Sequence, residues 1–180
     1  MSHDKLYNMA INYCQHYLVS QEKLAEYLSR KVHLGTENDV ERGELLNKVP
    51  SLVSQMTRLG FVNDKEAASA KLRSTLRSGY APSVASGLAA VKAKVDINVL
   101  NDMLAETLRE SFPDLEGSWE GSKKDEFLAR AALSRSRRGP FRGAKRTQKT
   151  DQRDMAWLQR RGYRYEEICR AMKLEPDDFF

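Results

Sequence analysis

Apolar residues recur every three or four positions along most of the chain, and the strict alternation of a β-strand is essentially absent. This spacing is seen in Leu24, Tyr27, Leu28 and Val32, and again in Leu52, Val53, Met56 and Leu59. It gathers apolar side chains on one face of an α-helix, which can then be buried against other helices. The pattern therefore predicts an all-α fold.

Glycines that follow apolar or basic runs predict where these helices end. A glycine just beyond a helix can adopt the left-handed conformation that closes its last turn. The candidates are Gly35, Gly60, Gly79, Gly139 and Gly162. Start signals are Ser20 before Gln21, Asn63 with Glu66, Pro82, and Ser122 with Asp125. Together they predict nine helices, over residues 5–18, 21–33, 50–59, 64–78, 82–94, 97–111, 123–138, 151–161 and 165–173.

A glycine followed by an aromatic residue marks three of the predicted junctions. These are Gly60-Phe61, Gly79-Tyr80 and Gly162-Tyr163. Recurrence of one junction type favours tandem three-helix repeats. We expect a first unit over residues 1–62, a second over 63–113, a linker over 114–122 and a third unit over 123–180, which carries a basic loop and the C-terminal tail. Residues 34–48 are polar and acidic, and are expected to form a loop.

Composition narrows the class of protein. With 41% hydrophobic and 31% charged residues among 180, the chain is expected to be soluble and folded. No apolar run reaches membrane-spanning length, and residues 1–9 lack the apolar core of a signal peptide, which predicts a cytoplasmic protein. Cys14 and Cys169 lie far apart in sequence and are interpreted as small buried hydrophobic residues.

Residues suited to catalysis are sparse. His3, His16 and His33 all lie near the N-terminus and fit no metal-binding or triad pattern. The segment from Gly139 to Lys145 lacks the spacing of a phosphate-binding loop. The sequence thus predicts a non-enzymatic protein without cofactor or metal.

Basic residues concentrate between Lys123 and Arg161 in a chain of net charge +5. Such a concentration favours an anionic partner, although a solvated helix end would also explain a single basic residue. The candidate contact residues are Lys71, Arg73, Arg77, Arg130, Arg135, Arg137, Arg138 and Arg142. For Arg160 and Arg161, favourable interaction with a helix dipole is an adequate explanation.

Aromatic residues lie among these charges, and two interpretations are open for them. Phe127, Trp157, Tyr163 and Tyr165 could stack on nucleobases, but packing in a hydrophobic core is favoured. The end of the chain, Asp177 to Phe180, is expected to be a frayed tail whose phenylalanines could contact a partner.

Four stretches, taken in order, resemble the RecX family over most of the chain. They are Ser20 to Lys31, Leu59 to Ala68 with its glycine-aromatic junction, Arg77 to Val84, and Leu158 to Ile168. Residues 34–48 and 139–150 are longer or looser than the family pattern. Ser78 and Ala81 replace the basic character usual near the second junction.

The resemblance implies an elongated, curved array of three-helix units that lies in the groove of the RecA filament on single-stranded DNA. It implies a non-enzymatic regulator of the inhibitory kind, which restrains ATP hydrolysis and strand exchange during recombination and repair. Independently of the resemblance, a monomer is the default expectation. The basic residues would then contact the filament or its DNA. The alternative is an independent nucleic-acid-binding module of helix-turn-helix type, since such modules also consist of small three-helix units with basic helices.

Overall fold

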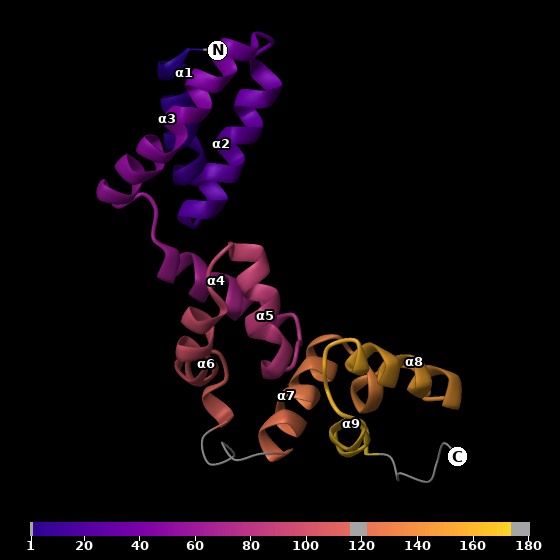
Figure 1. Ribbon diagram of the computed structural model, residues 1–180. Coiled ribbons are helices and arrows are strands. Elements are labelled where there is room, and N and C mark those ends of the chain that lie inside the picture. Colours follow the sequence, from indigo (N-terminus) through magenta and orange to yellow (C-terminus); the bar gives the residue numbers. More distant parts are fainter. Residues whose placement is uncertain (1, 116–121, 174–180) are drawn as a thin grey trace. The chain divides into compact units, whose positions relative to one another are not determined.

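The computed structural model describes residues 2–115 and 122–173, and all regular structure within these residues is helical (Figure 1). The α-helices are α1 (His3–His16), α2 (Gln21–Gly35), α3 (Asp39–Arg58), α4 (Asp64–Arg77), α5 (Pro82–Ala93), α6 (Ile97–Ser111), α7 (Ser122–Arg135), α8 (Gln148–Gln159) and α9 (Tyr165–Met172). Two 3₁₀ helices are η1 (Pro113–Leu115) and η2 (Gly139–Phe141). The predicted all-α class is confirmed. Among the described helices, none is both long and apolar enough to cross a membrane.

The chain forms two compact units whose boundaries fall within helices. One comprises Met1–Lys71 with Ala90–Val99, and the other Leu72–Ala89 with Leu100–Phe180. The boundaries therefore cut α4, α5 and α6. The division into three repeated three-helix units stays a prediction, although α1 to α3 pack together in the first compact unit and α7 to α9 in the second.

The first compact unit has its core between α1, α2 and α3. The core side chains include Leu6, Leu24, Leu28, Val32 and Met56, each completely buried. Ser20 caps α2 as predicted, because its hydroxyl accepts from the Lys23 N–H at 3.2 Å. That hydroxyl also donates to the Ala93 carbonyl, which ties the start of α2 to the end of α5 within the same unit.

Helix α3 begins eleven residues before the predicted start at residue 50, so the loop expected over residues 34–48 is wrong from Asp39 onward. Asn38 starts the helix, since its side-chain oxygen accepts from Val40 N–H at 2.9 Å and Glu41 N–H at 3.2 Å. Leu45 and Val49 are buried in the core. Burial of these two side chains against other helices stabilises the first half of α3, although the polar composition of this segment predicts a loop.

The junction glycines follow the prediction at four of five positions. Gly60, Gly79, Gly139 and Gly162 have positive φ angles, whereas Gly35 is the last residue of α2 and is followed by extended Thr36. An added Cβ on Gly79 would lie 2.8 Å from the Cβ of Ala132, and one on Gly162 would lie closer still to Val84 Cγ2.

Two further predicted helix starts are confirmed, and one lies partly outside the described side chains. Asn63 caps α4 by accepting from the N–H groups of Lys65 and Glu66 at 3.1 and 3.2 Å, and α5 begins at Pro82. The predicted pairing of Ser122 with Asp125 and most of the 114–122 linker lie outside the described residues or side chains, as does the tail from Asp177 to Phe180.

In the second compact unit, α7, α8 and α9 surround a core that includes Leu133, Leu158, Ile168 and Met172. The glycine-aromatic junctions of residues 79–80 and 162–163 meet in this unit. The Ala81 N–H donates to the Arg161 carbonyl at 2.9 Å, and a Cβ on Gly162 would collide with Val84. The end of α8 is therefore fixed against the start of α5.

Candidate partner-binding surface

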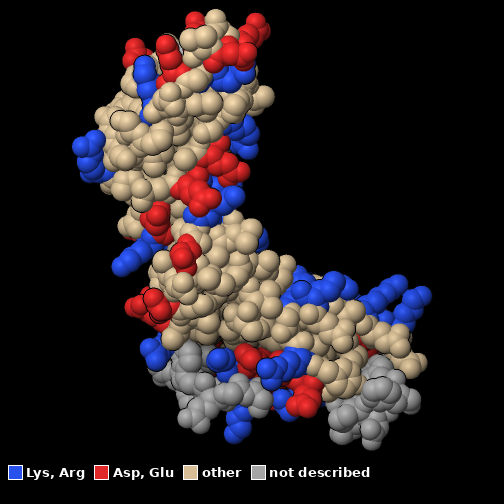
Figure 2. Space-filling view, in the orientation of Figure 1, with Lys and Arg blue, Asp and Glu red and all other residues tan. Residues whose placement is uncertain are grey.

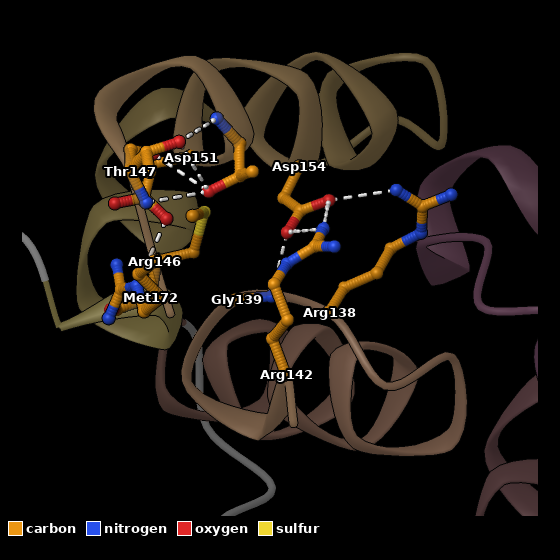
Figure 3. Close-up of polar contacts among 9 residues, drawn as sticks. Arg138, Gly139, Arg142, Arg146, Thr147, Asp151, Asp154 and Met172 are labelled. Atoms are coloured by element: carbon orange, nitrogen blue, oxygen red, sulfur yellow. Dashed lines mark hydrogen bonds and ion pairs between the residues drawn. The ribbon is translucent and has the colours of Figure 1, made fainter. Parts of the chain in front are cut away.

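Asp154 of α8 is the centre of a polar network in the basic region, and its side chain is fully buried. Its carboxylate accepts from the Gly139 N–H at 2.8 Å, from Arg138 Nη1 at 2.8 Å and from Arg142 Nη2 at 3.0 and 2.8 Å (Figure 3). A buried carboxylate is tolerated only when it is paired and hydrogen-bonded. Asp154 thus anchors η2 and two arginines to α8.

The same contacts control the ionisation of Asp154. Burial raises its pKa, but hydrogen bonds from Arg142, Gly139 and Arg138, with the charge of Arg142, outweigh burial and hold the pKa below its ordinary value. Two guanidinium groups share one carboxylate, so the cluster keeps a net positive charge of one. Both arginine side chains remain partly exposed, at 33% and 26%.

A second ion pair lies one turn earlier on α8. Arg146 Nε contacts Asp151 Oδ1 at 3.0 Å, and Arg146 Nη1 donates to the Met172 carbonyl at 3.3 Å (Figure 3). Arg146 therefore links the loop before α8 to the end of α9, and Asp151 holds its guanidinium.

Arg135, Arg77 and Arg137 differ from the Asp154-bound pair because all three are exposed. Arg135 Nη1 donates to the Arg77 carbonyl at 2.6 Å, and its guanidinium lies 5.3 Å from the Phe112 ring centroid. Arg137, the second residue after α7, lies in the left-handed region at φ +50°. These residues present positive charge from α4 and the end of α7.

The remaining predicted contact residues lie in other surroundings. The Arg130 guanidinium is 5.4 Å from the Phe141 ring centroid, and Arg73 contacts Glu110 at 3.4 Å. Lys71 is exposed but belongs to the first compact unit. The predicted set therefore comprises exposed arginines, arginines held by acids, Arg130 beside an aromatic ring, and a lysine in the first compact unit. Its role in binding stays a prediction.

Basic side chains are visible along the edges of the second unit, where those at the lower edge lie among acidic side chains (Figure 2). Figure 2 shows several Lys and Arg side chains along the edge formed by α7 and α8. Among the described residues, no group of three metal-ligating side chains is found. The arrangement is suited to binding an anionic partner by charge and hydrogen bonding.

The sequence interpretation missed both acids, although a signal was present. Asp151, Asp154, Met155 and Leu158 have helical core spacing, and all four are buried. An acid within an apolar stripe is a sign of a buried ion pair. Among the aromatic residues, Tyr163 is packed in the core at 4% exposed. Phe127, Trp157 and Tyr165 are partly exposed, and the Arg161 guanidinium lies 3.6 Å from the Trp157 ring centroid.

Comparisons with known proteins show similarity both in sequence and in structure. No family model matches the chain. A protein named regulatory protein RecX from Myxococcus xanthus (strain DK1622) is 29% identical over 162 residues, covering 89% of this chain and 80% of that protein. The crystal structure of RecX from Lactobacillus salivarius superposes with a TM-score of 0.54 at 16% identity, over 94% of both chains. The sequence similarity confirms the resemblance to the RecX family that the motifs indicate, and the structural similarity shows a shared fold; this chain is similar to these two RecX proteins over most of its length.

Proposed function

We propose that this protein is a non-enzymatic regulator of a RecA recombinase, acting in the cytoplasm as a monomer. The observation that carries the proposal is the sequence similarity to a regulatory protein RecX over most of both chains. It binds in the groove of the RecA filament on single-stranded DNA, and it restrains ATP hydrolysis and strand exchange.

The described basic surface supports this proposal through its distribution of charge. Arg77, Arg135 and Arg137 are exposed and are the residues best placed to contact the filament directly. Arg138 and Arg142 are partly exposed while bound to Asp154, so they contact the partner with only part of their donors. A basic surface complements an acidic assembly that surrounds nucleic acid.

Co-sedimentation with RecA filaments tests the proposal. The filaments are assembled on single-stranded DNA with a non-hydrolysable ATP analogue. We expect the double variant Arg135→Glu/Arg137→Glu to bind about tenfold more weakly or worse, because surface charges of the wrong sign oppose association. The matched control is Arg58→Glu/Lys65→Glu, which makes the same charge change at two exposed residues of α3 and α4.

Equal binding by both double variants would contradict the assignment of this surface. Helical content measured by circular dichroism shows that each variant is folded. Tight, salt-dependent binding of the protein to bare DNA, with no effect of adding RecA, would instead support an independent nucleic-acid-binding module.

A further inference from the structure

Arg161, the second residue after α8, is held between two aromatic rings in the second compact unit. Its guanidinium lies 3.6 Å from the Trp157 ring centroid and 5.2 Å from that of Tyr80. Its Nε donates to the Ser78 carbonyl at 3.3 Å, and its Nη1 donates to the Trp157 carbonyl at 3.4 Å. Stacking and hydrogen bonding together fix the plane of this cation.

The neighbours of Arg161 are cations. Arg138 lies 5.0 Å from the Trp157 ring centroid, so two guanidiniums share that ring. Within the described chain, no carboxylate forms an ion pair with Arg161 or with exposed Arg160. Burial, with the charges of Arg138 and Arg160, lowers the pKa of Arg161 although Tyr80 opposes this. Asp154 pairs with Arg138, so the positive charge without a matching acid among the described residues is that of Arg160 and Arg161.

Helix capping explains only part of this arrangement. A guanidinium has five N–H groups, and the two carbonyl contacts engage two of them. Three N–H groups therefore have no protein acceptor among the described residues. Arg161 is only partly buried, so these donors can be reached from solvent. A fixed planar cation with unused donors fits the oxygens of a phosphate.

We propose that Arg161, with Arg160 and Arg138 beside it, forms a binding site for the phosphodiester backbone of single-stranded nucleic acid. Trp157 and Tyr80 hold Arg161 in place and do not stack on bases, because Arg161 already covers them. The ligand is recognised by its charge and phosphate oxygens, so the site has no base preference. This extends the proposed function by assigning the DNA contact to particular residues, and it can be tested without RecA.

The test is the binding of a labelled 30-nucleotide oligothymidylate, by fluorescence anisotropy, across a series of salt concentrations. We expect weak binding to the protein at low ionic strength. Arg161→Gln should weaken it about fivefold to tenfold and reduce the slope of log affinity against log salt by about 0.7, the value for one single-strand phosphate contact. Arg160→Gln should have a similar effect, and it alters an exposed residue that forms no ion pair within the described chain.

The matched control is Arg170→Gln, which removes the same charge from the same compact unit. Arg170 is paired with an acid, since its Nε lies 3.5 Å from Glu126 Oε2. This variant should change affinity by less than twofold. A direct reporter is available in a Trp119→Phe background, where Trp157 is the remaining tryptophan. Oligonucleotide binding should change its emission through Arg161.

Absence of oligonucleotide binding, or equal losses in Arg160→Gln and Arg170→Gln, would overturn this site. Either result leaves the proposed function standing if the protein still inhibits RecA. Arg161-dependent binding to the oligonucleotide in a protein without any effect on RecA would support the site and contradict the proposed function.

Discussion

The Gly139 N–H donates to Asp154 Oδ2 at 2.8 Å, so one carboxylate fixes the loop backbone as well as the two arginines it neutralises. Gly139 is buried, and its φ of +52° places its N–H toward α8. The loop after α7 is thereby held in one conformation, and so are Arg138 and Arg142. Stability and presentation of charge depend on the same acid.

Replacing Asp154 by Asn should destabilise the protein by about 3 kcal/mol, because two arginines and a backbone N–H lose a charged acceptor in a buried position. The matched control, Asp151→Asn, makes the same charge change one turn away but affects a carboxylate with one arginine partner, and should cost about 1 kcal/mol. Urea denaturation measures both. Equal losses in the free energy of unfolding would show that the Asp154 network stabilises the fold no more than the Asp151 ion pair does.

Asp154 also predicts a pH dependence. Because the folded state lowers its pKa from the ordinary value of 3.8, the stabilisation is fully present above that value and is lost as pH falls through the lower pKa of the folded state. Thermal unfolding between pH 2.5 and 7 should therefore show a larger acid-induced decrease in wild type than in Asp154→Asn. If the melting temperatures of the two proteins fell in parallel with pH, Asp154 would not be the source of the acid-induced loss of stability.

Asp125 of α7 should behave in the opposite way. Burial and the charge of Glu167 raise its pKa, although Lys124 and Arg164 oppose them, and its buried Oδ1 has no hydrogen-bond donor among the described residues. Ionisation then destabilises the fold increasingly as pH rises above the ordinary pKa. Asp125→Asn should raise the melting temperature at pH 7 and have little effect near pH 3. A lower melting temperature at pH 7 would show that the carboxylate is stabilising.

Glycine substitutions test the contact between the two junctions of the second unit. Gly162→Ala should cost about 2 to 4 kcal/mol, since it combines a strained positive φ of +90° with a collision against Val84. Gly43→Ala is the control, because its added methyl meets nothing within 4 Å in helix α3. That change should stabilise by about 0.5 to 1 kcal/mol. The midpoints of urea denaturation measure both changes. An unchanged midpoint in Gly162→Ala would contradict the close contact between Gly162 and Val84.

Much of the fold follows from local sequence, whereas the acids of the site do not. Helical spacing and junction glycines such as Gly60 act within a few residues, so their effects are visible in the sequence. The first half of α3 was missed because Leu45 and Val49 are stabilised by burial against other helices. Asp154 contacts Arg138 sixteen residues away, and only folding shows that this arginine is partly neutralised.

A substitution at Arg137 should change stability and filament binding in opposite directions. Its φ of +50° is unfavourable for a residue with a side chain, and the Arg138 N–H closes the helix end by donating to the Leu133 carbonyl at 2.9 Å. Arg137→Gly should therefore stabilise the fold by about 1 kcal/mol while weakening filament binding severalfold. Melting and co-sedimentation measure the two effects. Unchanged binding would remove Arg137 from the contact surface.

The central claim is tested most directly by titrating the protein into RecA-catalysed ATP hydrolysis on single-stranded DNA, with Arg135→Glu/Arg137→Glu in parallel. The proposed function predicts that wild type suppresses hydrolysis at substoichiometric amounts and that the folded double variant requires at least several times more protein. Hydrolysis that continues unchanged at a stoichiometric excess of wild-type protein would contradict it.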